Sequence, residues 1–148
     1  MRYRGFERVK DASKDVKLPT RSDLRSAGYD IYSNEDAIIA PNTMHVFKTD
    51  VKAYMPSNEY LAIHVRSSIG IKKHLMLANI TGIIDSSYYS NIQNDGNLLV
   101  ALYNYGDESV EIKKYDRIAQ GIFSSYYITD DDKPLSDIRT GGVGSSGK

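Results

Sequence analysis

The chain has 148 residues, with 19 basic and 19 acidic side chains and no cysteine. This length is sufficient for one domain with a sizeable core. The balanced charge argues against a protein that neutralises the phosphates of DNA or RNA. The lack of cysteine excludes disulfides, thiol nucleophiles and cysteine-bound metals.

No stretch approaches the roughly 20 consecutive apolar residues that a membrane helix needs. The first residues also lack the apolar run of a signal peptide. We therefore expect a soluble, cytoplasmic protein with neither a membrane nor a nucleic acid as partner.

Short segments of alternating or continuous apolar character, separated by turn residues, predict strands along the chain. The alternation from Phe47 to Met55 predicts a half-buried strand, and residues 61–65 repeat the pattern. Residues 98–103 and 118–128 read as strands inside a sandwich or barrel. Only residues 68–75 favour a short helix. The pattern predicts an all-β sandwich or jelly roll.

The C-terminus differs in composition from the rest of the chain. Four of the eleven glycines lie in the last eight residues, after the acidic stretch 130–132. Composition alone favours a disordered tail. Backbone N–H groups freed by glycine, beside serine hydroxyls and Arg139, equally suit an arm that closes over an anion. We divide the chain into a β domain, 1–128, and a C-terminal arm, 129–148.

Five short segments occur in the order and near the spacing found in the trimeric dUTPase family. The chain resembles that family from about residue 18 to its end. Each segment alone is a weak signal, but five in the right order are a strong one. They are SAGYDI at 26–31, RSSIG at 66–70, NITGIIDSSY at 79–88, DRIAQ at 116–120 and RTGGVGSSG at 139–147.

The resemblance implies a fold, an assembly and an activity. The fold is a distorted jelly roll of the dUTPase-like β-clip type, with one short helix and a flexible arm. Three subunits build three sites at their interfaces: one chain gives the first, second and fourth segments, another the third, and the last chain's tail closes the lid. The reaction is hydrolysis of dUTP to dUMP and pyrophosphate, which keeps uracil out of DNA and supplies dUMP for dTTP synthesis.

The third segment carries the residue that we assign to catalysis. Asp85 follows two isoleucines, so its carboxylate emerges from an apolar run; a lone aspartate at a strand end is otherwise usually a cap. The resemblance makes Asp85 the base that activates water for in-line attack on the α-phosphorus. It makes Tyr88 the aromatic that packs under the deoxyribose and leaves little room for a 2′-hydroxyl.

Phosphate contacts are expected from Arg66, Ser67 and Ser68, which combine a guanidinium, hydroxyls and N–H groups at a helix start. Out of context, ordinary capping would explain such a turn. Gln120 matches a phosphate-side glutamine of the family. Asp116 and Arg117 are expected to hold the strand and a subunit contact. From the arm, the family implies substrate contacts by Arg139, Gly142, Val143, Ser145 and Ser146.

Base recognition is assigned to Asn79, between Leu77 and Ile80 in a stretch that reads as buried. An amide can meet the acceptor–donor–acceptor edge of uracil; alternatively, Asn79 ties down a turn. Mg²⁺ is the expected cofactor, held by substrate phosphates and water rather than by direct protein ligands. Asp30 matches a family aspartate that acts on the metal through water.

Two departures from the family pattern concern the lid. Val143 stands where the family has a phenylalanine that stacks on the uracil, and the region from Tyr89 to Asn97 is longer than usual. We hypothesise that Tyr89 supplies the missing stacking, which is worth about 1–3 kcal/mol per base. The alternative is that Tyr89 only packs at a subunit interface.

Two other functions remain open from the residues alone. A dCTP deaminase shares the fold and the Arg-Ser-Ser cradle, although the sequence around Asp85 suits water activation at phosphorus better. The second alternative is a regulatory factor that keeps the scaffold and binds a protein partner through its altered lid and lengthened region.

Overall fold

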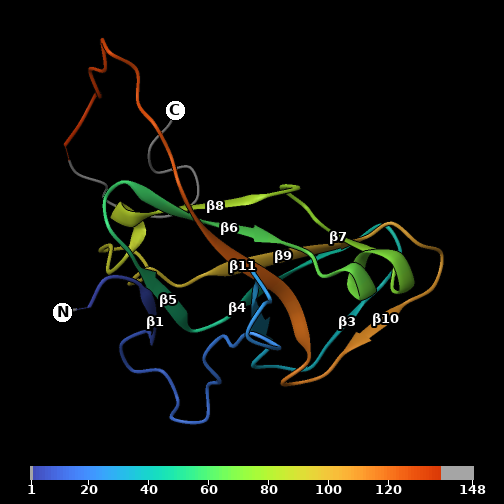
Figure 1. Ribbon diagram of the computed structural model, residues 1–148. Helices are drawn as coiled ribbons and strands as arrows, with labels where there is room; N and C mark the ends of the chain where they lie inside the picture. Colours follow the sequence, from blue (N-terminus) through green and yellow to red (C-terminus); the bar gives the residue numbers. More distant parts are fainter. Residues whose placement is uncertain (1, 138–148) are drawn as a thin grey trace.

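The computed structural model describes residues 2–137, which form eleven antiparallel strands and two short helical turns (Figure 1). The all-β prediction is confirmed. The strands are β1 (Gly5–Arg8), β2 (Tyr29–Tyr32), β3 (Ala37–Ile39), β4 (Met44–Lys48), β5 (Val51–Tyr54), β6 (Glu59–His64), β7 (Leu75–Leu77), β8 (Gly82–Asp85), β9 (Leu99–Asn104), β10 (Val110–Ile112) and β11 (Arg117–Ser125); the turns are η1 (Ser68–Lys72) and η2 (Ser86–Tyr88).

The strands pair into four small sheets. The largest has the order β2-β11-β6-β8, and a three-stranded sheet has the order β4-β9-β7. Two ribbons, β1-β5 and β3-β10, complete the fold. Inward-facing aliphatic and aromatic residues of all four sheets meet in a single buried cluster. Each such side chain contributes about 1.5–3 kcal/mol by leaving water, so this cluster supplies most of the fold's stability.

The strand predicted from Phe47 to Met55 is divided into β4 and β5. Asp50 lies between them with a positive φ of 57°, a conformation that costs free energy unless contacts hold it. The Asp50 carboxylate supplies those contacts by accepting hydrogen bonds from Asn34 Nδ2 at 2.7 Å and Asn97 Nδ2 at 2.8 Å. In the sequence, the alternation of residue types continues across Asp50. The pattern therefore predicted one continuous strand.

Two other boundaries differ from the sequence prediction. The strand predicted over 118–128 ends at Ser125, and the helix predicted over 68–75 is only the turn Ser68–Lys72. Within residues 2–137, no helix is long and apolar enough to cross a membrane.

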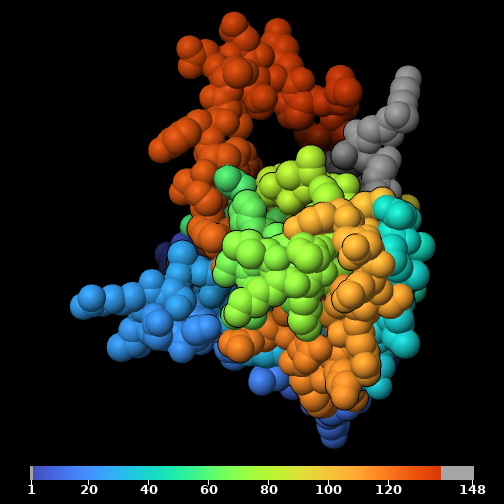
Figure 2. Space-filling view, turned by 90° about the vertical axis from the view of Figure 1, so that its right-hand side faces the viewer, coloured from blue at the N-terminus to red at the C-terminus, as the bar shows by residue number. Residues whose placement is uncertain are grey.

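The segment after β11 leaves the body of the subunit. Residues 126–137 run beyond the turn that precedes β6 and project as a separate lobe (Figures 1 and 2). Tyr126 is tied to the body through its N–H to Asn58 O and its hydroxyl to Ser57 O. Farther on, Tyr127 is 96% and Leu135 103% exposed. Exposed apolar side chains on a segment that projects from its own subunit are suited to docking on another chain.

Candidate active site

One face of the four-stranded sheet carries residues from several of the five segments. Asp30 on β2 pairs with Gln120 on β11, and Gln120 pairs with His64 on β6. Farther along the same strands, Tyr60 on β6 pairs with Asp85 on β8. Directly paired residues project to the same side of an antiparallel sheet, and so do residues four apart on one strand. All five residues therefore share the face that points away from the core.

A hollow of about 290 Å³ opens at the β2 end of this face. Ligand pockets usually exceed about 300 Å³, so one chain offers part of a nucleotide site rather than a complete one. The hollow brings together the first, second and fourth segments as predicted. Its lining consists of Ser22, Ser26, Ala27, Gly28, Asp30, Arg66, Ser67, Gln120 and Ile122.

Asp30 is the buried anchor of this hollow. It is 5% exposed, and its Oδ1 lies 2.9 Å from Arg66 Nε. Its Oδ2 accepts a hydrogen bond from Ser22 Oγ at 3.1 Å and lies 3.6 Å from Arg117 Nη1. Burial of a carboxylate is costly without such partners. The pairing uses Nε of Arg66 and thereby leaves its two terminal nitrogens for phosphate oxygens.

The fourth segment differs from expectation in one respect. Asp116 has the structural role predicted for it, since its Oδ2 accepts the Lys113 N–H at 2.9 Å. Arg117 instead reaches Asp30 and places a second guanidinium at the edge of the hollow. Ser22 was also missed, because no sequence signal connects its loop to the site. Ile122 could have been predicted, because it lies two residues after Gln120 and faces the same side.

The serines predicted to bind phosphate follow Arg66 at the start of η1. Ser67 occupies the capping position, but its hydroxyl makes no capping hydrogen bond. The capping explanation is therefore wrong for Ser67, and its hydroxyl is available at the rim of the hollow. Ser68 begins the turn, and its carbonyl accepts the Lys73 N–H at 3.3 Å.

Gln120 is held close to the first segment. Its Nε2 donates to Val65 O at 3.3 Å, and a Cβ added at Gly28 would lie 2.3 Å from its Oε1. Glycine is thus required at 28 so that the amide can sit beside the backbone. The side chain that the sequence predicted for the phosphates is held by its hydrogen bond to Val65 O and has room there because residue 28 is glycine.

Asp85 lies at the far edge of the same face. Three strand intervals and four residues of strand separate it from Asp30, which amounts to roughly 20 Å between Cα atoms. Ile83, on the same face of β8, is 56% exposed. The structure therefore does not bring Asp85 to Arg66 within one chain. It presents them on one continuous surface with an apolar residue close to Asp85.

Asn79 lies in the turn between β7 and β8 and is exposed, so the prediction of a buried position is wrong for the single chain. The reason is that β7 and β8 pair with different strands and the turn spans the gap between two sheets. Ile80 is 74% exposed and adopts a positive φ of 66°, a strained conformation for a β-branched residue. Such strain gathers at ligand-binding turns.

Tyr88 is 7% exposed, and residues of the region 89–97 contact its hydroxyl. Tyr88 Oη donates to Asn97 O at 2.6 Å and accepts from Asn94 Nδ2 at 2.7 Å. The neighbouring Tyr89 turns the other way. Its hydroxyl donates to Glu7 Oε1 at 2.9 Å, and Lys52 Nζ lies 4.8 Å from its ring centroid. Stacking of Tyr89 on the base stays a prediction; these contacts favour a packing role.

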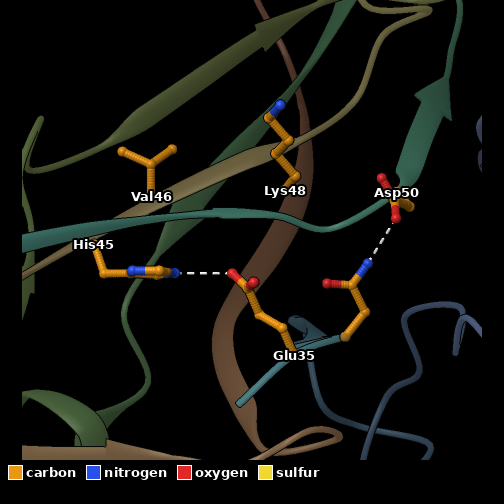
Figure 3. Close-up of a pocket in the computed structure, with 6 residues that line it drawn as sticks. Glu35, His45, Val46, Lys48 and Asp50 are labelled. Atoms are coloured by element: carbon orange, nitrogen blue, oxygen red, sulfur yellow. Dashed lines mark hydrogen bonds and ion pairs between the residues drawn. The ribbon is translucent and has the colours of Figure 1, made fainter. Parts of the chain in front are cut away.

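The remaining site residues lie outside the described part of the chain: Arg139, Gly142, Val143, Ser145 and Ser146. Among residues 2–137, no three His, Asp or Glu side chains gather as a metal-binding group. His45 and Glu35 form a pair, with Nε2 and Oε1 2.8 Å apart, beside Asn34 and Asp50 in a second, shallow hollow (Figure 3). It contains none of the predicted site residues.

The chain is similar to several known proteins. The dUTPase family model matches residues 14–147. A deoxyuridine 5'-triphosphate nucleotidohydrolase of Lactococcus lactis is 41% identical, over 99% of both chains. A dUTPase crystal structure from Streptococcus mutans is 36% identical, with a TM-score of 0.80 over 85% of this chain and 98% of that one. A mutant dUTPase from phage phi11 of S. aureus, in which a structural Mg(II) ion is described, shares the fold at 21% identity and a TM-score of 0.74, over 91% of this chain and 98% of that one.

Proposed function

The chain belongs to the dUTPase family and hydrolyses dUTP to dUMP and pyrophosphate, and we propose that it does so in sites completed by neighbouring copies of itself. The observation that carries the proposal is the separation of Asp85 from Arg66 on a shared sheet face. A base and a phosphate cradle that far apart cannot act on one phosphorus unless two chains are juxtaposed.

Exposed apolar surface supports the same assembly. Ile80 and Ile83 are more than half exposed around the third segment, and Tyr127 and Ile128, which directly precede the arm, are in the same state. A stable monomer rarely leaves such residues uncovered together. In the proposed homotrimer, the third segment of one subunit packs beside the hollow of the next, and the arm extends over a neighbouring site.

The proposed reaction is a single in-line displacement. Arg66, Ser67 and Gln120 hold the triphosphate, while the Asp85 carboxylate of the adjacent subunit accepts a proton from water. The water oxygen bonds to the α-phosphorus, the bond from that phosphorus to the bridging oxygen breaks, and pyrophosphate leaves. Tyr88 forms the floor under the deoxyribose, and Asn79 reads the uracil edge.

The residues of the hollow suit Mg²⁺ only when the ion is bound to the phosphates of the substrate. Arg66, Ser67 and Gln120 are suited to phosphate oxygens, and the Asp30 carboxylate is already paired with arginine. Mg²⁺ commonly binds through phosphates and retained water, and when bound it neutralises phosphate charge. Asp30 would reach it through water, and no direct protein ligand is proposed.

The arm supplies the proposed closing step. Arg139 would pair with the γ-phosphate, while Gly142, Val143, Ser145 and Ser146 would cover the nucleotide and exclude water. The two alternative functions, a dCTP deaminase and a purely regulatory factor, are not favoured by the comparisons. Incubation with dCTP, followed by an assay for ammonia, tests the first directly.

Replacement of Asp85 by asparagine tests the proposed base. Asparagine keeps the shape of the side chain but cannot accept the proton. Pyrophosphate release from dUTP should therefore lose about 10²–10⁴-fold in kcat, with KM little changed. The exposed Asp107→Asn is the matched control and should behave as wild type. An Asp85→Asn enzyme with normal kcat would remove Asp85 from the mechanism.

A further inference from the structure

The hydroxyl of Tyr88 is satisfied on both sides by the region 89–97, which is longer than in the family pattern. It donates to Asn97 O and accepts from Asn94 Nδ2. A phenol hydroxyl has one proton to give and usually accepts one strong hydrogen bond, so these two contacts use its normal capacity. The ring, 7% exposed, is thus held at its buried end.

Asn94 is itself fixed by the backbone and by a second amide. Its Oδ1 accepts the Gly96 N–H at 3.1 Å and Asn91 Nδ2 at 2.8 Å, which orients Nδ2 toward Tyr88. Asn91 Nδ2 also donates to Tyr88 O at 2.8 Å. The segment therefore forms hydrogen bonds with both the hydroxyl and the backbone carbonyl of Tyr88.

The segment 89–97 is itself held to the body of the fold, through hydrogen bonds with Asp50 and Lys52. Asn97 Nδ2 donates to Asp50 Oδ1 at 2.8 Å. Lys52, 8% exposed, donates to both oxygens of Asp95 at 3.0 Å and to Ser90 Oγ at 3.1 Å. A residue in this network cannot shift without breaking several partly buried hydrogen bonds. The segment can therefore transmit rigidity to Tyr88.

We propose that Asn94 is a positioning residue that holds the Tyr88 ring in place and thereby sets the discrimination between deoxyribose and ribose. The inference rests on the proposed role of Tyr88 under the sugar. A steric floor rejects a 2′-hydroxyl only if it does not yield, and a ring held at one end by Asn94 cannot tilt away from the added oxygen. Asn94 does not touch the substrate.

The test compares kcat/KM for dUTP and UTP in the full-length enzyme. Asn94→Ala should lower the dUTP-to-UTP ratio about tenfold or more, on the scale of a single contact in a specificity pocket. Most of that change should come from improved use of UTP, whereas simple loss of stability would lower both activities together. Ile92→Ala, in the same segment but 87% exposed, is the matched control and should keep the wild-type ratio.

A double mutant tests whether Asn94 acts through the Tyr88 hydroxyl. Tyr88→Phe removes the bond to Asn94 together with the bond to Asn97 O and should lower the ratio alone; Asn94→Ala added to it should change nothing further. If Asn94→Ala does not fold, Tyr88→Phe still tests the claim. Unchanged ratios in Asn94→Ala or in Tyr88→Phe would overturn the inference, and so would additive losses in the double mutant. Absence of dUTP turnover in the unaltered chain would overturn the function instead.

Discussion

Asp30 and Asp85 lie on one face of the same four-stranded sheet, at opposite edges and four residues apart in register. The sheet therefore presents the proposed phosphate cradle and the proposed base on one face, but too far apart to act on one phosphorus. Juxtaposition of two such faces would make a complete site, and the catalytic unit is then the assembly and not the chain.

The contact between Gly28 and Gln120 offers a selective way to disturb the cradle. A methyl group at 28 would lie 2.3 Å from Gln120 Oε1, the mobile end of a side chain, so Gly28→Ala should displace the amide and leave the fold intact. We expect KM for dUTP to rise about tenfold, the scale of one lost hydrogen bond to a charged group. Gly70→Ala, whose added Cβ would lie 3.5 Å from Val65 Cγ2, is the control and should leave KM for dUTP unchanged. A wild-type KM in Gly28→Ala would mean that Gln120 does not bind phosphate.

Asp30→Asn should release Arg66 while preserving the shape of the anchor. The neutral amide removes the charge that holds Nε at 2.9 Å, so KM for dUTP should rise. Stability should fall by less than the about 3–5 kcal/mol of a broken, fully buried pair, because the Arg66 side chain is 25% exposed. Steady-state kinetics and thermal unfolding measure the two effects. If KM stayed constant while stability fell, Asp30 would be structural only.

Tyr89→Ala separates the two roles considered for that residue. The contacts of Tyr89 with Glu7, Lys52 and Tyr54 predict a lower unfolding midpoint with KM for dUTP near its wild-type value. Deletion of a large, partly buried aromatic commonly costs about 1–3 kcal/mol. A marked rise in KM at unchanged stability would restore the stacking hypothesis. Tyr89→Phe, which loses only the bond to Glu7, should show a small part of the stability effect.

Acid should weaken the ion pair between Asp95 and Lys52, which holds the segment 89–97. Burial raises the pKa of Asp95, but hydrogen bonds from the Lys10 N–H and from Lys52 outweigh it and hold the pKa below its ordinary 3.8. The stabilisation is therefore complete above pH 3.8 and is lost as the pH falls through the lower folded-state pKa. The difference in unfolding midpoint between wild type and Asp95→Asn should stay constant above that pH and shrink in acid. A difference that grows in acid would contradict the pairing.

The sequence predicted the parts of this protein that depend on local chemistry. Alternation and turn residues identified the β fold, and the order of five segments predicted Arg66, Ser67 and Gln120, which the structure brings to one hollow; the catalytic role of Asp85 stays a prediction. It could not predict the break at Asp50, because the contacts that hold the positive φ come from Asn34 and Asn97, which are distant in sequence.

Exposure was harder to predict than residue type. Asn79 lies between apolar neighbours and was read as buried, yet it occupies a turn whose strands belong to different sheets. Similarly, nothing in the spacing shows that Asn94 meets Tyr88 or that Arg117 reaches Asp30. These contacts depend on how loops close over the sheets, and period-two patterns carry no information on loop closure.

Mixed assemblies provide the most direct measurement of the shared site. Arg66→Ala removes the cradle and Asp85→Asn removes the base, so each variant alone should be nearly inactive. After unfolding and refolding together in equal amounts, about one site in four should combine an intact Arg66 with an intact Asp85 from another chain. We predict recovery of dUTP hydrolysis to about that fraction of wild type. Mixed trimers that form and stay inactive would contradict the account.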